Sequence, residues 1–382
     1  MKDKGAVYGA KYGWERANWF APPGVPPEDE HTFEIPNWFE LVAAEHKNAR
    51  ENVALIDQSS FSKFEVEGSG ALTLLNRLSV SRIDQPVGKV VYTQMCNERG
   101  TIEVDLTIGR LDQDRFLLVV GTAFGLRALR WIKNYLPSDG SVAVREMTSA
   151  YAVINVVGPK SRKLLQKLTP ADISNEGFAF GTCKKFSVGY APVTAYRVTY
   201  VGELGYELYI PAEFAAHVYE SLWEAGQDLG IKNAGYRTIA SMHLEKGYAD
   251  WGSELTPEYT PFDAGLGFCV ALGKEDFIGK KTLAKVKTEG PQLRLCTFTL
   301  ETDRPVMLHS SAPIVADGKV LGVVTSSGYG HTVKKNICYA YISVEDIRPE
   351  ESYAIEAYRQ VYKARLEPSR VLYDPERKKM LM

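Results

Sequence analysis

The chain lacks the short motifs by which several large enzyme classes are recognised. Its 382 residues contain no Gly-x-x-x-x-Gly-Lys-Ser/Thr phosphate loop, no Gly-x-Ser-x-Gly nucleophile turn and no His-Glu-x-x-His zinc motif. Gly68-Ser-Gly70 matches the start of a dinucleotide-binding turn, but Thr73 stands where the third glycine belongs. A P-loop ATPase, a serine esterase of the nucleophile-turn type or a zinc peptidase is therefore not predicted.

Cysteine is scarce, and its few copies are dispersed. None of them forms a Cys-x-x-Cys pair or the spacing of a small secreted scaffold, and the six histidines show no metal-ligand spacing. The five are Cys96, Cys183, Cys269, Cys296 and Cys338. We therefore expect a reducing compartment and no metal site.

Long apolar runs are also missing. No stretch approaches the roughly 18 apolar residues that a membrane-spanning helix needs. The opening Met1-Lys2-Asp3-Lys4 is not followed by the apolar core of a secretory signal. We expect a cytoplasmic protein with no membrane partner.

Neither sign of charge is in excess. The sequence has 45 Lys and Arg against 47 Asp and Glu, a formal net charge of −2. Nucleic-acid binding depends on a basic surface that neutralises phosphates, so no nucleic-acid partner is predicted. Hydrophobic residues make up 45% and charged residues 24%, as in an ordinary globular protein, and the length favours two or three domains.

The first 36 residues are rich in tryptophan, proline and glycine. This composition predicts an N-terminal arm over 1–36, extended and with its aromatic residues docked on a neighbour. A plain linker is the alternative. From residue 37 to 52 apolar residues recur with helical spacing, which predicts a helix.

The pattern downstream of the arm predicts an α+β protein. Strands are expected at 63–68, 100–109, 115–120, 151–157 and, as a pair, within 193–210. Helices are expected at 70–78, 123–135, 160–168 and 213–225. This order favours two interleaved ferredoxin-like units over residues 37–273, one of them inserted at about 56–147.

The last hundred residues differ from the rest. After the charged stretch 274–290 the pattern becomes all-β. The expected strands are 294–300, 312–324 with a turn at Asp317-Gly318, 337–344 and 361–366. We expect a C-terminal β-barrel domain over 274–382.

Three separated segments carry polar residues that a scaffold alone does not require. The first, 91–100, leads into a strand whose alternation turns Asp105 away from the packed face. The second, 200–209, reads Tyr-Val-Gly-Glu-Leu-Gly-Tyr-Glu-Leu-Tyr, a glycine-rich hairpin with two carboxylates. The third, 235–247, is a predicted helix with Arg237 at its start.

In order and spacing, these segments resemble the folate-dependent aminomethyltransferase (glycine-cleavage T-protein) family. Its patterns Tyr-Thr-x-Met-x-Asn-x-x-Gly-Gly-Ile-x-x-Asp and Tyr-x-Gly-Glu-x-Gly-Tyr/Phe-Glu correspond to 92–105 and 200–207. Residues 276–281 and 322–330 resemble the family's C-terminal barrel. The resemblance implies a three-domain cloverleaf fold and tetrahydrofolate as the cofactor.

Within the family, residues 5–20 resemble the join that precedes the folate domain of dimethylglycine and sarcosine dehydrogenases, here without the flavin domain. Some positions depart from the T-protein pattern: Thr101 replaces a glycine, Val104 an aspartate, and Ser60-Phe61 the usual His-Met. These departures argue against the glycine-cleavage system itself, while the folate site remains.

The resemblance implies a role for four residues. Glu207 would accept the two adjacent N–H donors of the pterin, and Arg237 would hold that carboxylate or the polar edge of the folate. Tyr92 would pack beside an aromatic ring of the folate. Asp105 would be catalytic, next to the nitrogens that receive the one-carbon unit.

Each assignment has a structural alternative. Asp105 is otherwise a solvated strand carboxylate, Glu207 and Arg237 an ion pair, and Tyr92 a core aromatic residue. Glu203 is a further cofactor-binding candidate that is otherwise a turn residue. Three aromatic residues are candidates for the substrate mouth or for packing: Tyr248, Trp251 and Tyr329.

Two reactions fit one folate site. Either a flavin-dependent amine dehydrogenase partner oxidises an N-methyl group and this chain captures the product as methylene-tetrahydrofolate, or the chain takes an intact methyl group from an N-, O- or S-methyl donor. An N-methyl amine is the favoured small methylated substrate in this one-carbon demethylation. The alternative is a non-catalytic folate-binding or regulatory module, or the folate subunit of a flavin amine dehydrogenase complex.

Overall fold

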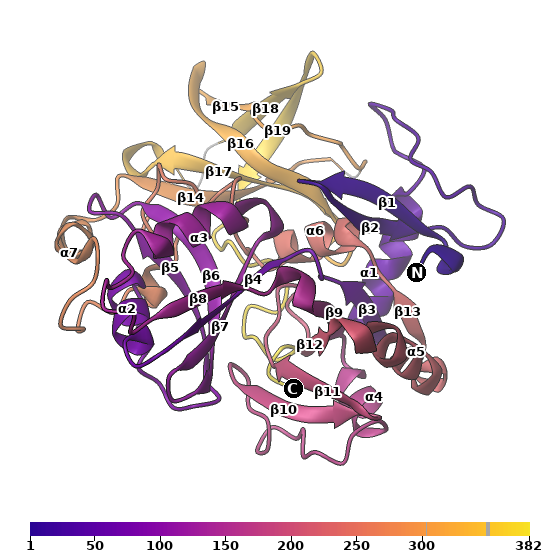
Figure 1. The fold of residues 1–382 in the computed structure, drawn as a ribbon. Helices are drawn as coiled ribbons and strands as arrows, with labels where there is room; N and C mark the ends of the chain where they lie inside the picture. Colours follow the sequence, from indigo (N-terminus) through magenta and orange to yellow (C-terminus); the bar gives the residue numbers. More distant parts are fainter. Residues whose placement is uncertain (303, 349–351) are drawn as a thin grey trace.

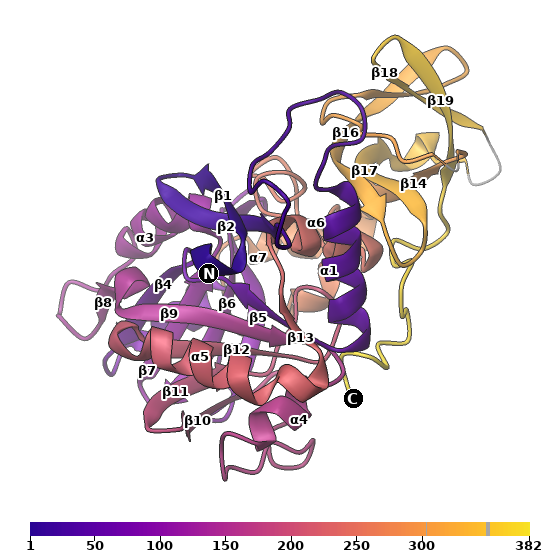
Figure 2. The same cartoon turned by 90° about the vertical axis from the view of Figure 1, so that its right-hand side faces the viewer.

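The computed structural model describes residues 1–302, 304–348 and 352–382. The chain forms two open sheets, a closed barrel and a separate two-stranded hairpin (Figure 1). The barrel stands to one side of the two sheets in both views (Figures 1 and 2). The C-terminus returns to the sheets, where Arg197 donates a hydrogen bond to the carbonyl of Met382 at 2.8 Å.

A six-stranded sheet has the order β10-β11-β12-β9-β3-β13. Its strands are β3 (Val53–Asp57), β9 (Tyr151–Val157), β10 (Cys183–Val188), β11 (Ala191–Tyr196), β12 (Gly205–Pro211) and β13 (Ile231–Asn233). Helices α4 (Ser161–Gln166) and α5 (Ala215–Ala225) cover one face. Alternate residues of β9 and β12 form the core beneath them, Val156 and Leu208 among them.

A five-stranded sheet has the order β5-β6-β7-β4-β8. Its strands are β4 (Ser62–Glu67), β5 (Val90–Cys96), β6 (Ile102–Asp112), β7 (Arg115–Val120) and β8 (Ala143–Glu146). Helices α2 (Ala71–Leu78) and α3 (Gly125–Lys133) pack on the face that carries Val104 and Leu106. All five strands lie between β3 and β9 in sequence, so one unit interrupts the other.

The C-terminal strands close into a barrel in the order β14-β17-β16-β15-β18-β19. They are β14 (Leu293–Leu300), β15 (Pro313–Ala316), β16 (Lys319–Gly330), β17 (Lys335–Ser343), β18 (Tyr353–Ala357) and β19 (Gln360–Leu366). Inward residues such as Phe298, Ile314 and Ile355 fill it. The predicted α+β class with a C-terminal barrel is confirmed.

Two helices connect these bodies. Helix α1 (Phe39–Glu51) packs against α6 (Tyr236–Glu245), and α6 also contacts β16 of the barrel. The buried Glu45 of α1 accepts hydrogen bonds from the Gly235 N–H at 2.9 Å and the Thr238 hydroxyl at 2.6 Å, which caps the start of α6. A side chain at Gly235 would collide with the backbone of Asn18, so glycine allows β2 to lie against this helix end.

The N-terminal arm is not extended, which corrects the prediction. Strands β1 (Ala6–Lys11) and β2 (Trp14–Phe20) pair as a hairpin, and Trp19 is fully buried beside Val42 of α1. The turn residues Tyr12 and Gly13 both have positive φ, as a two-residue hairpin loop requires. Tyr-Gly is a weaker turn signal than Asn-Gly, so composition alone favoured an arm.

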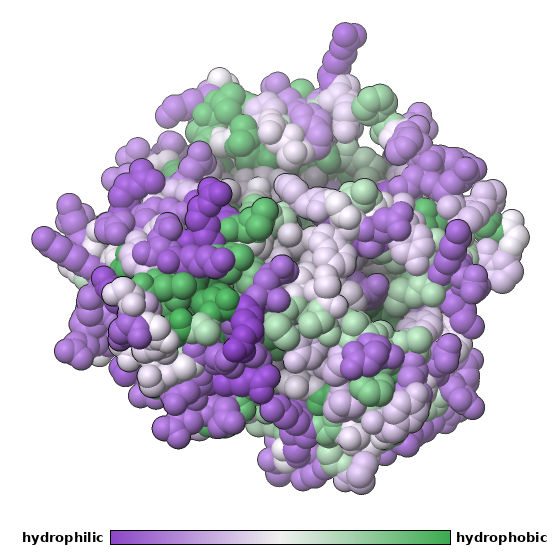
Figure 3. Space-filling model, viewed as in Figure 1, coloured by the Kyte–Doolittle hydropathy of each residue, from purple (hydrophilic) through white to green (hydrophobic). Residues whose placement is uncertain are grey.

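Helix α7 (Lys280–Glu289) was also not expected. It lies in the charged stretch after residue 274, and Leu283 is its buried residue. A helix that buries so little shows no apolar stripe in sequence. Across the face drawn in Figure 3 the surface is mostly hydrophilic, with apolar residues gathered over the five-stranded unit.

Candidate functional site

Asp105 lies on the face of the five-stranded sheet opposite its helices. It is directly opposite Gln94 of β5 in the strand register, and the next pair on the same face is Thr107 and Tyr92. Side chains directly opposite on antiparallel strands share a face. The three segment residues Tyr92, Gln94 and Asp105 therefore lie side by side.

Glu207 lies on the face of the six-stranded sheet opposite α4 and α5. In the register it stands between Tyr196 of β11 and Asn155 of β9, and Asn155 is next to Ile56 of β3. Gln58 continues this surface beyond the end of β3, because its N–H bonds the carbonyl of Val153 at 2.9 Å. One polar row thus crosses the sheet.

These two faces pack against each other. Leu117 and Val119 of β7 share an apolar cluster with Val153, Tyr196 and Tyr209 of the other sheet. The Tyr196 hydroxyl donates to the Leu117 carbonyl at 3.1 Å. The faces that carry the polar residues of the two sheets are therefore turned toward each other. We call these residues the inter-sheet site: Gln58, Tyr92, Gln94, Asp105, Asn155 and Glu207.

Asp105 is an acid held in a poorly solvated place. Its carboxylate accepts a hydrogen bond from Gln94 Nε2 at 2.8 Å and another from the Tyr92 hydroxyl. Burial raises the pKa of Asp105 to about 6 in spite of these two bonds, and the charge of Asp250 raises it further. Such a carboxyl is poised to exchange a proton near neutral pH.

Tyr92 and Tyr200 flank this carboxyl. Burial raises the pKa of both phenols well above the ordinary value, and the charge of Asp105 contributes to both shifts. Tyr92 is nevertheless 37% exposed. A ring that is densely surrounded and still reaches solvent lies at an opening, so a ligand can approach Asp105 along Tyr92.

Glu207 has unused hydrogen-bonding capacity. It is 9% exposed, and burial raises its pKa above the ordinary value against a hydrogen bond from Tyr209. That bond, to Oε2 at 2.7 Å, is the one it makes within the described residues. A carboxylate has about four acceptor positions, so Glu207 can accept two further N–H groups.

Arg237 does not pair with Glu207, contrary to one of the two arrangements predicted for it. It forms an ion pair with Asp29 at 2.7 Å and lies over the Trp38 ring at 4.0 Å. Both partners belong to the segment between β2 and α1, which folds across the start of α6. Sequence spacing placed Arg237 on α6, whereas the partner was decided by the path of the N-terminal segment.

Glu203 also lies apart from the other candidates. It is fully buried, and its Oε1 accepts from Arg50 at 2.9 Å and from the Tyr373 hydroxyl at 2.8 Å. The same Arg50 reaches Glu245 at 2.9 Å. These contacts join the hairpin of residues 200–207 to α1, α6 and the C-terminal segment. Glu203 is thus part of a buried ion-pair network.

The three aromatic candidates are distributed differently. Tyr248 stacks on Tyr200 with ring centroids 5.9 Å apart, so it is close to the inter-sheet site. Trp251 packs edge-on against Phe124 at 5.4 Å, and its buried Nε1 has no hydrogen-bond partner. Tyr329 packs against Phe39 of α1 at 5.5 Å, at the contact between helix and barrel.

Three residues of the inter-sheet site were not predicted from sequence, namely Gln58, Gln94 and Asn155, and neither was Tyr200 beside Asp105. Gln94 and Tyr200 stand inside the segments already singled out. Asn155 is the one polar residue of the strand Tyr-Ala-Val-Ile-Asn-Val-Val, and this interruption was a usable signal. Gln58 follows a strand end, where a polar residue is ordinary, so it gave none.

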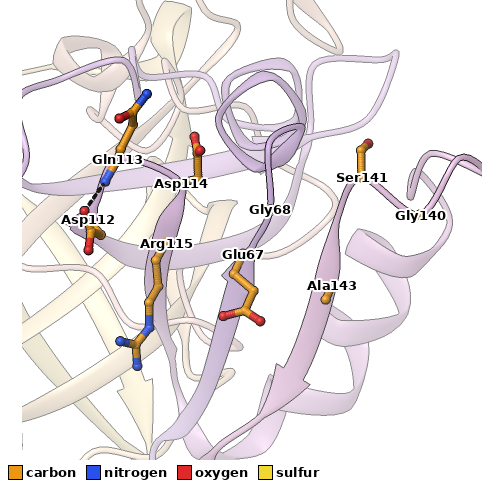
Figure 4. A pocket seen from close by; sticks show the side chains of 9 residues that line it. All are labelled: Glu67, Gly68, Asp112, Gln113, Asp114, Arg115, Gly140, Ser141 and Ala143. Atoms are coloured by element: carbon orange, nitrogen blue, oxygen red, sulfur yellow. Dashed lines mark hydrogen bonds between the residues drawn. The ribbon is translucent and has the colours of Figure 1, made fainter.

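One surface hollow lies elsewhere. It has a volume of about 450 Å³, and its residues come from the ends of β4, β6, β7 and β8. Asp112, Asp114 and Arg115 line it without converging on one point (Figure 4). Asp112 is seven residues along β6 from Asp105, roughly 23 Å at the rise of a strand. This hollow is not part of the inter-sheet site.

Two structural features are absent from the described residues. No three side chains of histidine, cysteine, aspartate or glutamate gather there as a metal-ligand group. None of the helices in this part of the chain combines the length and hydrophobicity that crossing a membrane requires.

Comparison with known families identifies the chain. Residues 1–274 match the model described as GCVT N-terminal domain, and residues 294–374 match the glycine cleavage T-protein C-terminal barrel domain. The chain therefore belongs to the glycine-cleavage T-protein, or aminomethyltransferase, family. This family is tetrahydrofolate-binding.

Relatives of two lengths match this chain. It is 38% identical to 4-methylaminobutanoate oxidase (formaldehyde-forming) of Paenarthrobacter nicotinovorans, over 98% of this chain and 45% of that protein. It is 37% identical to mitochondrial dimethylglycine dehydrogenase of Mus musculus, over 96% and 42%. The chain thus spans less than half the length of these two relatives. With the aminomethyltransferase of Halothermothrix orenii it shares 34% identity, over 85% of this chain and 90% of the other.

A solved structure has the same fold. The glycine cleavage system aminomethyltransferase T from Bartonella henselae aligns with a TM-score of 0.83, at 23% identity, over 97% of this chain and 95% of that one. The predicted T-protein-like fold is confirmed.

The residues present fit a tetrahydrofolate. Its pterin carries an N–H and an amino group side by side, which matches the free acceptor positions of Glu207. Both amide atoms of Gln58 and of Asn155, and Oε1 of Gln94, are buried without a partner. Buried polar groups are normally satisfied, so these atoms are available to bond a polar ligand between the sheets.

Proposed function

We propose that this protein is a tetrahydrofolate-dependent one-carbon transferase that acts on a small methylated substrate. The observation that carries the proposal is the position of Glu207 and Asp105 on two facing sheets in a chain of the T-protein family. When bound, tetrahydrofolate supplies the nitrogen that accepts the one-carbon unit. The remaining steps belong to side chains of this protein.

Glu207 anchors the pterin end. Its carboxylate accepts the adjacent N–H groups of the ring, in a bidentate contact that fixes both position and orientation. Tyr209 holds one carboxylate oxygen at 2.7 Å and so sets the plane of the group. Tyr92 forms a flat wall beside an aromatic ring of the ligand.

Asp105 acts at the reacting nitrogen. With its pKa raised to about 6, Asp105 is mostly ionised at neutral pH and is a stronger base than an ordinary aspartate. Gln94 and Tyr92 hold the carboxylate in place through hydrogen bonds to its oxygens. Asp105 can thus orient the nitrogen, take its proton or stabilise a developing positive charge.

An N-methyl amine is the substrate class we propose. Two relatives are named for N-methylated amino acids, 4-methylaminobutanoate and dimethylglycine. Both are named as an oxidase or a dehydrogenase, which supports a flavin-dependent amine dehydrogenase as partner and a methylene unit as the transferred group. We also propose a cytoplasmic location, and a role for Arg237 at the polar edge of the folate.

A binding and turnover experiment tests the proposal. Calorimetry should show that tetrahydrofolate binds the protein. Incubation with tetrahydrofolate and a panel of N-, O- and S-methyl donors, with and without an added amine dehydrogenase, should give methyl- or methylene-tetrahydrofolate by mass. Binding without product from any donor would support a folate-binding module, and absence of binding would contradict both.

A further inference from the structure

The polar row of the six-stranded sheet contains two amide side chains that the fold leaves unsatisfied. Gln58 and Asn155 are both fully buried. Neither the oxygen nor the nitrogen of either amide has a hydrogen-bond partner. Four polar atoms without partners in one small region are unusual, because nearly all buried polar groups in proteins are paired.

Their position relates them to Glu207. Asn155 is directly opposite Glu207 in the register of β9 and β12, which places the two Cβ atoms roughly 5 Å apart on one face. Gln58 is hydrogen-bonded through its N–H to Val153, two residues before Asn155, and so stands diagonally beside it. All three side chains point at the five-stranded sheet.

We propose that Asn155 and Gln58 are pterin-binding residues that complete the contact made by Glu207; this inference rests on the proposed function. The edge of a reduced pterin presents an amino group, a ring N–H and a carbonyl in a row. Glu207 matches the first two, which are donors. The neighbouring amide of Asn155 donates to the carbonyl, and Gln58 pairs with the next polar group of the ring.

Stability and ligand affinity together distinguish a binding role of these two amides from a structural role. An amide that serves the fold is paired within the fold, so its removal destabilises the protein. An amide that pairs only with a ligand destabilises the unliganded protein, because it is buried there without a partner. An apolar replacement of the same size should therefore leave the unliganded protein as stable or more stable and should weaken ligand binding. Stability and affinity should then change in opposite directions.

The test uses the full chain with two variants, Asn155→Leu and Gln58→Met. For each, the melting temperature without ligand and the affinities for tetrahydrofolate and 6-methyltetrahydropterin are measured by calorimetry. We expect an unchanged or higher melting temperature and at least tenfold weaker binding. The factor should be the same for both ligands, because the contact is at the pterin end.

Ser79→Ala is the matched control. Ser79 is fully buried, its hydroxyl also lacks a partner, and it precedes β5 away from the polar row. This variant should share the gain in stability and bind tetrahydrofolate as the wild type does.

Each other outcome has a definite meaning. Wild-type affinity in both variants would overturn the inference, because the amides would then bond water and not the pterin. Loss of folding in both variants would also overturn it, because the amides would then stabilise the fold. Either result leaves the proposed function standing. Failure of the wild-type protein to bind tetrahydrofolate would contradict the proposed function, and the inference with it.

Discussion

The molecule contains two buried groups of polar side chains that differ in how completely they are paired. One is the ion-pair network: Arg50, Glu203, Glu245 and His46. The other is the inter-sheet site. Both are shielded from bulk water, and both contain carboxylates carried by motif segments, so burial alone does not distinguish them.

Pairing does distinguish them. In the network, Arg50 bonds Glu203 and Glu245 at 2.9 Å each, and Glu245 also accepts from the backbone N–H groups of Thr332 and Val333. Of its carboxylate oxygens, Oε2 of Glu203 is the one without a partner. In the inter-sheet site, five amide atoms have none. A network that is paired internally holds the fold together, whereas the unused groups of the inter-sheet site support the proposed ligand contact.

The largest effect is expected at the centre of the ion-pair network. Arg50→Met leaves two buried carboxylates without their cation, and breaking a buried pair in this way costs about 3–5 kcal/mol. Urea unfolding should show this loss. As a control, Arg145→Met removes a cation that is 55% exposed, while Glu65 keeps its ion pair with Arg115, so stability should change little. Equal effects in the two variants would contradict the assignment of Arg50.

The second prediction concerns Glu203 and Glu207, the two glutamates of one hairpin. Glu207→Ala should weaken tetrahydrofolate binding by about 1.5–3 kcal/mol, the range for hydrogen bonds to a charged group. Glu203→Gln should instead lower stability and leave binding unchanged, because its partner is Arg50. Calorimetry measures the tetrahydrofolate affinity of both variants, and urea unfolding measures their stability. If Glu203→Gln weakened binding as much, the division between the two groups would be wrong.

A third prediction concerns pH. The pKa of Asp105 is raised from its ordinary value to about 6, so the ionised fraction rises from about 10% at pH 5 to about 90% at pH 7. Turnover should rise across this window. Asp105→Asn should lower turnover, abolish this rise and keep tetrahydrofolate affinity within a few fold. A wild-type pH profile retained by the variant would remove Asp105 from the mechanism.

The smallest effect is expected at Arg237. Its ion pair with Asp29 is partly exposed, so Asp29→Asn should cost at most about 1 kcal/mol of stability. Arg237→Met should cost somewhat more, because the contact with the Trp38 ring is lost as well. Tetrahydrofolate affinity separates the two roles: a loss in Arg237→Met alone supports ligand contact, and equal affinities in both variants leave Arg237 a structural residue.

Sequence predicted the regular parts of the fold because their patterns are local. The predicted bounds of β7 and β9 coincide with the structure, since each is a largely apolar run that a glycine ends. The hairpin β1-β2 and helix α7 were missed because their turn and burial signals are weak. The family resemblance named Asp105, Tyr92 and Glu207 for the site. It did not predict the partners of Arg237 and Glu203, which depend on segments distant in sequence.

The sequence cannot show that the side-chain amides of Gln58 and Asn155 are unpaired. Their significance is that their side-chain amides have no hydrogen-bond partner, and the absence of a partner depends on every residue packed around them. Asn155 alone left a trace, as a polar residue inside an apolar strand. A residue that serves a ligand by remaining unpaired is recognised only after the fold has been examined.

The most direct test is a crystal structure of the protein with tetrahydrofolate. The account predicts the pterin between the two sheets, with its N–H groups within hydrogen-bond distance of Glu207 and the reacting nitrogens beside Asp105. A ligand bound at the hollow near Asp112, or one in contact with Glu203 and not with Glu207, would contradict it.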